Sequence, residues 1–227
     1  MQFLDRHDAG RRLAAELLPL AQERPVIVAL PRGGVPIGVE VARALDAPLD
    51  ILAVRKLGAP GNPEFGVGAV AEDGTGVIDP RSASEMGMTQ AVFEATLARE
   101  SQELRRRVER YRDGRPSIDV KGRTVIVVDD GLATGLTDLA AIRTLRSRGA
   151  HRIVLAVPVG SGPAVSMLAE EADRVICLTV PRHLLGVAMW YRDFTPVSDE
   201  QVLALLAEAA EDGDTPGAAG ATLSGAG

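Results

Sequence analysis

The stretch that decides the fold is VIVVDDGLATGLT, residues Val125 to Thr137. Its opening run of β-branched residues is typical of a strand that is buried on both faces of a parallel sheet. Two adjacent carboxylates, Asp129 and Asp130, end this run, and a loop of small and hydroxylated residues then leads into a helix with an apolar face. The sequence therefore predicts an α/β fold in which this strand, loop and helix carry a binding site.

The residue types in this stretch suit a phosphorylated sugar. At the carboxyl end of a buried strand, Asp129 and Asp130 reach the crevice where open α/β sheets bind ligands, and they can accept hydrogen bonds from sugar hydroxyls or hold a hydrated divalent cation. The loop from Gly131 to Thr137 offers backbone N–H groups, two threonine hydroxyls and a helix amino terminus to a phosphate. The alternative is a capped strand-to-helix turn without a ligand, which the adjacent acids disfavour.

This stretch closely resembles the phosphoribosyl pyrophosphate (PRPP) signature of the type I phosphoribosyltransferases. One position departs from the family pattern, because Gly131 stands where an aliphatic residue is usual, and this predicts a more mobile loop before ligand binds. The resemblance implies that Asp129 and Asp130 bind the ribose hydroxyls and take part in catalysis. It assigns the 5′-phosphate to the residues Ala133, Thr134, Gly135, Leu136 and Thr137.

A second strand-loop-helix unit, Ala29 to Pro36, repeats this arrangement with a cation added. Gly33 and Gly34 permit close backbone approach to an anion, and Arg32 adds planar donors suited to phosphate oxygens. The segment matches neither a P-loop nor a dinucleotide fingerprint. It resembles the family's pyrophosphate loop, so we expect pyrophosphate at Arg32, Gly33 and Gly34.

Two further segments resemble the adenine phosphoribosyltransferases. The run Val54 to Gly58 is similar to one with a pyrophosphate-binding arginine, which implies Arg55, and less directly Lys56, as pyrophosphate ligands. Glu64-Phe65-Gly66 resembles a Glu-Tyr-Gly of the flexible loop, which implies that Glu64 assists proton transfer. The alternatives are an exposed basic pair and an exposed loop glutamate. The segment Lys56 to Gly68, rich in Gly and Pro, is expected to be a loop that closes over the site.

The segment Val180 to Tyr191 resembles the hood of the 6-oxopurine enzymes, which implies a base pocket that contains His183, Leu184 and Trp190. The alternative is that the aromatic residues only pack the hood against the sheet. Ala133 replaces the catalytic aspartate of those enzymes, and Val157 to Gly160 lacks their base-reading lysine. We therefore do not expect hypoxanthine or guanine specificity.

Alternating strand and helix patterns predict the type I phosphoribosyltransferase fold, with a twisted, mainly parallel sheet flanked by helices, a small hood region and an inserted helix. A single domain over residues 1–210 is expected, with the hood built from 1–22 and 180–210, a helical insertion at about 81–116 and a disordered tail at 211–227. The expected helices are 6–22, 35–45, 89–112, 137–148, 163–171 and 199–210, and the expected strands are 26–30, 49–54, 69–71, 76–78, 125–128, 152–157 and 174–178.

Composition narrows the classes of partner and location. A formal charge of −6 argues against a general nucleic-acid-binding protein, and the arginines of the inserted helix are expected to be a solvated face balanced by glutamates, with an acidic partner as the alternative. The single cysteine, Cys177, has no partner for an intrachain disulfide and fits a reducing cytoplasm. No signal segment and no membrane-spanning run is evident. Exposed apolar residues on the inserted helix predict a homodimer.

These observations predict a cytoplasmic, Mg²⁺-dependent phosphoribosyltransferase of nucleotide salvage, which joins PRPP and a nucleobase or base-like acceptor and releases pyrophosphate. Mg²⁺ is expected at Asp129 and Asp130, through water or PRPP. The competing hypothesis is a regulatory protein that binds PRPP or a nucleotide without turnover. The sequence does not identify the acceptor.

Overall fold

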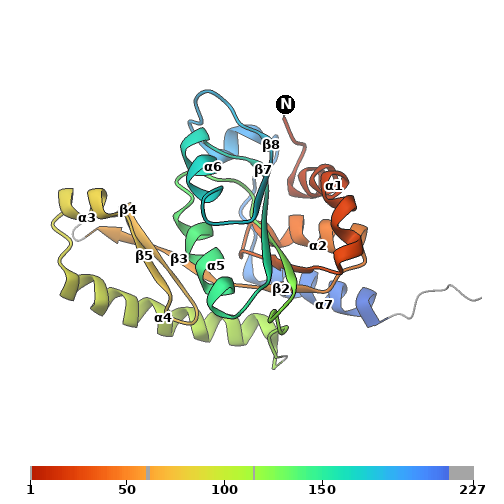
Figure 1. The fold of residues 1–227 in the computed structure, drawn as a ribbon, viewed down its shortest axis with the longest axis horizontal. Coiled ribbons are helices and arrows are strands. Elements are labelled where there is room, and N and C mark those ends of the chain that lie inside the picture. Colours follow the sequence, from red (N-terminus) through yellow and green to blue (C-terminus); the bar gives the residue numbers. More distant parts are fainter. Residues whose placement is uncertain (1, 60–61, 115, 215–227) are drawn as a thin grey trace, which may run out of the picture.

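The centre of the molecule is a five-stranded parallel sheet with the strand order β2-β1-β6-β7-β8 (Figure 1). The computed structural model describes residues 2–59, 62–114 and 116–214, without the side chains of residues 63–65 and 212–214. The predicted α/β fold class is confirmed. The strands of this sheet are β1 (Val26–Ala29), β2 (Leu49–Ile51), β6 (Thr124–Val128), β7 (Arg152–Val159) and β8 (Arg174–Thr179).

Helices cover both faces of this sheet, and the central strand shows why. Every residue of β6 is buried. Val125 and Val127 belong to the hydrophobic cluster that contains α5 and α6, whereas Ile126 and Val128 pack on the side of α1 and α2. Because successive side chains of a strand point to opposite faces, a continuous apolar run is what two covered faces require. The covering helices are α1 (Arg6–Leu17), α2 (Gly34–Leu45), α5 (Leu136–Ser147) and α6 (Gly162–Leu168).

The chain order reverses direction across the sheet between β1 and β6. From β1 the chain passes through α2 to β2 on one side, and from β6 it passes through α5 and α6 to β7 and β8 on the other. In such sheets the loops that follow the two central strands diverge and leave a crevice at the carboxyl edge. The two loops that carry the predicted phosphate sites, after β1 and after β6, therefore meet at one edge.

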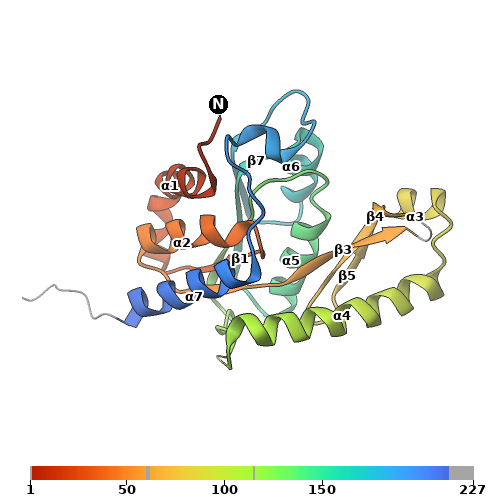
Figure 2. The same cartoon turned by 180° about the vertical axis from the view of Figure 1, so that it is seen from behind.

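A second, antiparallel sheet forms an arm beside the main sheet (Figures 1 and 2). It consists of β3 (Val54–Ala59), β4 (Asn62–Ala71) and β5 (Gly76–Ile78), followed by the helices α3 (Pro80–Glu85) and α4 (Gln90–Arg112). The prediction that Lys56 to Gly68 is a long loop was wrong, because β3 and β4 pair along much of this segment. The glycines serve close packing instead: a Cβ at Gly68 would lie 2.4 Å from the carbonyl oxygen of Val77.

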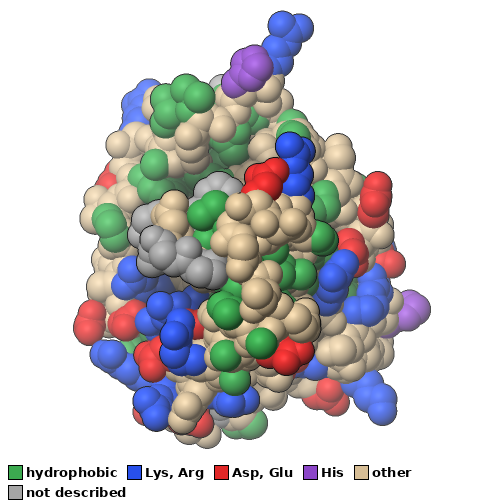
Figure 3. All heavy atoms as spheres, turned by 90° about the vertical axis from the view of Figure 1, so that its left-hand side faces the viewer, with side chains coloured by type: hydrophobic (Ala, Val, Ile, Leu, Met, Phe, Trp, Pro, Cys, Tyr) green, Lys and Arg blue, Asp and Glu red, His purple; other side chains and the backbone are tan. Residues whose placement is uncertain are grey.

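The predicted long helix of the insertion is confirmed as α4, with Thr89 as its amino-terminal cap. Phe93, Leu104 and Val108 on its inner face are buried against Leu57 and Val70 of the arm. The arginines between them are exposed. In Figure 3, which faces the arm, basic and acidic side chains are intermixed along the lower edge of the molecule, where α4 lies. This mixture agrees with the prediction that the arginines of this helix form a solvated face balanced by glutamates.

The largest differences from the predicted helix boundaries are at the carboxyl ends of the first and last helices. The first α-helix ends at Leu17, and a 3₁₀ helix, η1 (Leu18–Glu23), which carries a proline in its first turn, completes the predicted span. The last helix, α7 (Asp199–Asp214), runs beyond Ala210, so residues 211–214 are helical and not part of a tail, and residues 215–227 lie outside the described residues. None of the helices in the described part of the chain combines the length and apolar character that crossing a membrane requires.

A buried ionic network holds the arm to the main sheet. Glu72 is 6% exposed. Its Oε1 accepts hydrogen bonds from Arg112 of α4 at 3.2 Å and from Arg148 after α5 at 3.1 Å, and its Oε2 accepts one from the amide of Ala53 at 3.1 Å. One carboxylate thus joins the root of the arm to two helices.

We predict that Glu72→Ala lowers the free energy of unfolding by about 3 kcal/mol, because it removes the shared partner of two poorly exposed guanidinium groups. Urea denaturation would measure the loss. Glu103→Ala is the matched control, since Glu103 pairs only at the surface with Arg106, and it should change stability by less than about 0.5 kcal/mol. Equal effects of the two substitutions would contradict the proposed network.

Candidate functional site

The loops after β1 and β6 lie directly against each other. Leu30 donates its amide to the carbonyl of Val128 at 2.9 Å, and its own carbonyl accepts from the amide of Gly34 at 3.0 Å. A Cβ at Gly34 would lie 2.6 Å from the Val128 carbonyl oxygen, and a Cβ at Gly33 would lie 1.9 Å from Oδ2 of Asp130. The peptide bond between Pro31 and Arg32 is cis. A side chain at Gly34 would push the two loops apart because it meets backbone, whereas one at Gly33 would displace the carboxylate of Asp130.

The two acids at the end of β6 are held by different groups. Asp129 accepts the amide of Asp130 on its Oδ1 at 2.8 Å. Asp130 accepts two nitrogens of Arg6, Nε and Nη2, on its Oδ2 at 2.9 Å each, while the hydroxyl of Tyr191 donates to its backbone carbonyl at 2.7 Å. Both acids are only partly buried, so their side chains do not fill the hydrophobic core.

The contribution of Arg6 was missed by the sequence reading, which treated it only as the start of the first helix. Its partner Asp130 is 124 positions away in the chain, so no local spacing connects them. The guanidinium also donates to the carbonyl of Thr195 at 3.0 Å and lies 3.8 Å from the ring centre of Phe194.

The loop before α5 presents unused backbone donors. Within the described residues, no group accepts a hydrogen bond from the N–H groups of Ala133 to Thr137. The loop is held by other atoms: Leu132 donates its amide to the carbonyl of Val159 at 2.9 Å, and the hydroxyl of Ser161 donates to the carbonyl of Ala133 at 2.7 Å. Gly135, with φ of 76°, caps α5. A row of free N–H groups at a helix amino terminus can donate hydrogen bonds to an anion.

Asp138, on the first turn of α5, is a second residue that the sequence reading missed. It is 1% exposed, its Oδ2 accepts the hydroxyl of Thr137 at 3.2 Å, and its Oδ1 has no hydrogen-bond partner among the described residues. Burial raises the pKa of Asp138 to about 7. Burial also raises the pKa of Asp129, and the charges of Asp138 and Asp130 add to that rise.

Arg6 has the opposite effect on Asp130. Burial raises the pKa of Asp130, and the guanidinium of Arg6 opposes this rise by charge and by hydrogen bonding. The site thus brings three carboxyl groups near one another, and Arg6 pairs directly with one of them, Asp130. Such a group has an excess of negative charge that a divalent cation or hydroxyl donors can relieve.

The donor set is compatible with Mg²⁺ that completes its shell from outside the protein. Among the described residues, no set of three or more His, Cys, Asp or Glu side chains is arranged to hold a metal ion. Mg²⁺ usually takes one or two carboxylates together with water and substrate phosphates, and not an all-protein cage. Asp129 and Asp130 fit that mode of binding.

Comparison with known proteins agrees with this geometry. Residues 2–184 match the family model of the phosphoribosyl transferase domain. The chain belongs to the phosphoribosyl transferase family. A Mycobacterium tuberculosis (strain H37Rv) protein, whose name proposes a phosphoribosyl transferase, is 45% identical over 210 residues, which are 92% of this chain and 47% of that protein. The chain therefore spans about half the length of the curated relatives that it matches most fully.

A solved structure shows the same fold in a chain of similar sequence. The crystal structure of a Thermus thermophilus protein is 47% identical, with a TM-score of 0.78, and the match covers 92% of this chain and 99% of that one. A shorter match, 41% identical over 83 residues, links 32% of this chain to 26% of a Streptomyces coelicolor protein whose name proposes a ribose-phosphate pyrophosphokinase.

The basic residues expected to bind pyrophosphate lie in two places in this member of the family. Arg32 follows β1 at the crevice, is exposed, and has its Nη1 3.7 Å from Oδ1 of Asp199. Arg55 lies on β3 of the arm, where its Nε pairs with Oε2 of Glu100 at 2.9 Å. Lys56 and Arg55 line a cavity of about 430 Å³ between β3 and α4. In this conformation Arg55 pairs with Glu100 of α4, and Arg32 lies beside Asp199 of α7.

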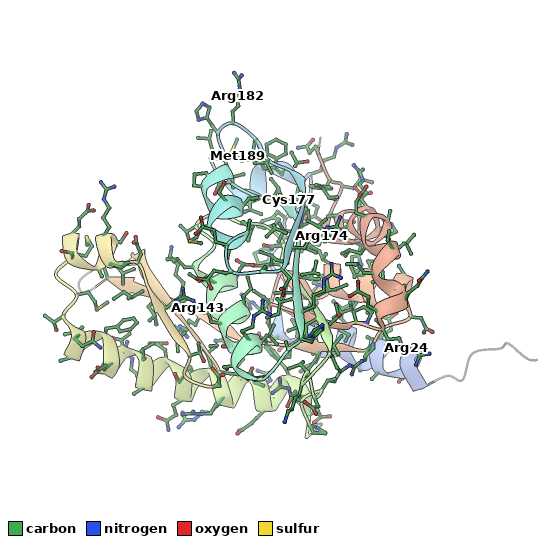
Figure 4. The ribbon with its side chains drawn as sticks, in the orientation of Figure 1. Arg24, Arg143, Arg174, Cys177, Arg182 and Met189 are labelled. Atoms are coloured by element: carbon green, nitrogen blue, oxygen red, sulfur yellow. The ribbon has the colours of Figure 1, made fainter. Side chains whose placement is uncertain are left out.

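The residues expected to meet the base are also spread out. Glu64 lies on β4, and its side chain is outside the described residues. His183 is exposed, and its neighbour Arg182 points away from the sheet at the tip of the hood loop (Figure 4). Leu184 is partly buried, and Trp190 packs against the cluster that contains α1 and α2.

Gly131, the departure from the family signature, has a packing role. A Cβ at this position would lie 2.6 Å from Val187 of the 3₁₀ helix η2 (Val187–Trp190) and 3.1 Å from Val159. The hood therefore rests directly on the loop that carries the acids. A larger residue at position 131 would have to lift the hood.

We predict that Asp138→Asn stabilises the protein more at pH 8 than at pH 5. The folded pKa of about 7 lies above the usual 3.8, so between these values the folded chain keeps a proton that the unfolded chain loses, and wild-type stability falls as the pH rises through this window. Asparagine removes this dependence, so the difference should grow by on the order of 3 kcal/mol. Urea denaturation at both pH values measures it, with Glu103→Gln as control, and a pH-independent difference would refute it.

Proposed function

We propose that this chain is a Mg²⁺-dependent phosphoribosyltransferase that transfers the 5-phosphoribosyl group of PRPP to a nucleobase or base-like acceptor and releases pyrophosphate. One observation supports this most: the free N–H groups of Ala133 to Thr137 lie beside the acid pair at the same edge of the sheet. The free N–H groups suit the phosphate of a ribose 5-phosphate, and the two neighbouring carboxylates suit the hydroxyls of the same sugar. We also propose that the protein is a homodimer and that it acts in the cytoplasm.

The binding roles follow from position. The residues Ala133 to Thr137 would bind the 5′-phosphate, and Asp129 and Asp130 the ribose. Arg32, Gly33 and Gly34, on the facing loop, would bind pyrophosphate through one guanidinium and backbone N–H groups. Arg55 and Lys56 remain candidates, and Arg55 would have to exchange Glu100 for the pyrophosphate.

The reaction breaks the bond between C1 of the ribose and a pyrophosphate oxygen, which keeps the electron pair. The lone pair of an acceptor nitrogen forms the new bond to C1, and the acceptor then loses its proton. Charge grows on the leaving pyrophosphate, so donors preorganised around Arg32 contribute most where they bind that charge. Mg²⁺, held at Asp129 and Asp130 through water or PRPP oxygens, would neutralise part of the same charge. Glu64 is the candidate for the proton transfer.

The acceptor would bind beneath the hood, where His183, Leu184 and Trp190 are the proposed contacts. One observation favours the second candidate function, a regulatory protein that binds PRPP or a nucleotide without turnover. Ala133 carries no group that could take a proton, and His183 lies exposed. The two candidates share the phosphate and ribose sites and differ only in whether an acceptor reacts.

Binding is the first test of the shared part. We predict that PRPP with Mg²⁺ binds the wild type in isothermal titration, and that Asp130→Asn weakens this binding by about an order of magnitude because one charge and one acceptor oxygen are changed. Glu103→Gln, on the outer face of α4, should bind as the wild type does. Absence of wild-type binding at millimolar ligand would count against both candidates.

Turnover is the second test. The wild type with PRPP and Mg²⁺ is incubated with a panel of nucleobases, and released pyrophosphate is measured for each. Release that depends on one acceptor is expected for the transferase, and the new nucleotide should appear in equal amount. Binding of PRPP without release for any acceptor would favour the regulatory protein.

A further inference from the structure

The contact between Arg6 and Asp130 joins the amino-terminal helix to the ribose site. Two nitrogens of Arg6 meet one oxygen, Oδ2 of Asp130, at 2.9 Å each. Their side chains are 10% and 19% exposed, so solvent screens this pair much less than a surface pair. A charge-assisted contact with two donors also restricts the rotation of the carboxylate.

The second oxygen of Asp130 is left open. None of the described residues donates a hydrogen bond to its Oδ1. This oxygen is also accessible to solvent, because Asp138 Oδ1 is the buried side-chain oxygen without a partner among the described residues. Gly33 of the facing loop closes over Oδ2, where a Cβ would lie only 1.9 Å away. Arg6 therefore uses the oxygen on the side of Gly33 and leaves the other for a ligand.

Residues of the carboxyl-terminal part of the hood, within 180–210, contact Arg6. The ring centre of Phe194 lies 3.8 Å from its guanidinium carbon, and the carbonyl of Thr195 accepts its Nη1 at 3.0 Å. Tyr191, which donates to the backbone carbonyl of Asp130, pairs with the amino-terminal segment through a bridge to Phe3. Tyr191 therefore binds the carbonyl of Asp130 directly, and Phe194 and Thr195 hold the arginine that binds its carboxylate.

A purely structural ion pair would explain less of this arrangement. Such pairs are seldom more stabilising than apolar packing of the same volume, and they need their remaining hydrogen-bonding groups satisfied. Here Oδ1 has no donor among the described residues and is open to solvent at the carboxyl edge of the sheet, on the same loop as the free N–H groups before α5. That position is where a ligand, and not the protein, completes the hydrogen bonding.

We propose that Arg6 is a positioning residue of the ribose site: it fixes Asp130 through Oδ2, presents Oδ1 to a ribose hydroxyl, and ties this geometry to the hood. This rests on the proposed function. Arg6 then affects ligands that contain ribose, and it has little effect on pyrophosphate alone, which the loop at Arg32 to Gly34 would bind.

The test compares PRPP, ribose 5-phosphate and inorganic pyrophosphate, each with Mg²⁺, by isothermal titration on the full chain. For Arg6→Gln we expect PRPP and ribose 5-phosphate to bind about tenfold more weakly and pyrophosphate to change by less than about twofold. Arg6→Lys should restore part of the loss. Arg12→Gln is the matched control on the same helix, since Arg12 pairs with Asp8 and lies over Phe3, and it should bind all three ligands as the wild type does.

A double-mutant cycle separates positioning from direct binding. If Arg6 acts through Asp130, the double variant Arg6→Gln/Asp130→Asn should bind PRPP no more weakly than Asp130→Asn alone. Additive losses would overturn the proposal, as would unchanged ribose 5-phosphate binding in Arg6→Gln or an equal loss for pyrophosphate. If Arg6→Gln does not fold, Arg6→Lys replaces it, because it keeps the charge but offers one nitrogen in place of the two that meet Oδ2, and a smaller loss confined to the two ribose ligands is expected.

These outcomes are distinct from failure of the proposed function. A wild type that binds neither PRPP nor ribose 5-phosphate would refute the function itself. A wild type that binds both, with an Arg6→Gln variant that also binds both equally well, would refute only the role of Arg6.

Discussion

The whole site depends on the close contact between the loops after β1 and β6. These strands pair in parallel at the point where the chain order of the sheet reverses, so the loops that follow them leave in different directions and face one another. Gly34 lies against the Val128 carbonyl, and Gly33 lies against the carboxylate of Asp130. Without this contact, the free N–H groups before α5 and the cation on Arg32 would belong to separate surfaces.

The segment from the end of β6 to the first turn of α5 also places three carboxyl groups close together. Asp129, Asp130 and Asp138 come together where burial already raises the pKa of each, and Arg6 compensates only one of them directly. Asp138 even keeps a buried oxygen without a partner among the described residues. Functional sites tolerate such features because a ligand relieves them, and the surrounding sheet, buried on both faces, supplies the stability that the site gives up.

The arm is too ordered to close over the site as a flexible loop would. A loop rich in Gly and Pro would move as a flexible chain, whereas β3 and β4 form a paired ribbon with a small core of its own against α4. Glu72 fixes the root of that ribbon to Arg112 and Arg148. Motion of Arg55 toward the crevice would therefore require displacement of the ribbon or release of Arg55 from Glu100.

The sequence by itself determined the parallel sheet and the two strand-loop-helix units that follow β1 and β6, because these depend on local patterns: apolar runs, glycine pairs, and acids at strand ends. It also determined α4, whose cap and apolar stripe are local. Only the tertiary structure decided that Arg6 holds Asp130, that Asp138 joins the acids, and that the segment after Lys56 is a ribbon. Those features depend on contacts between distant parts of the chain, and neither residue type nor spacing encodes which distant partner a side chain will meet.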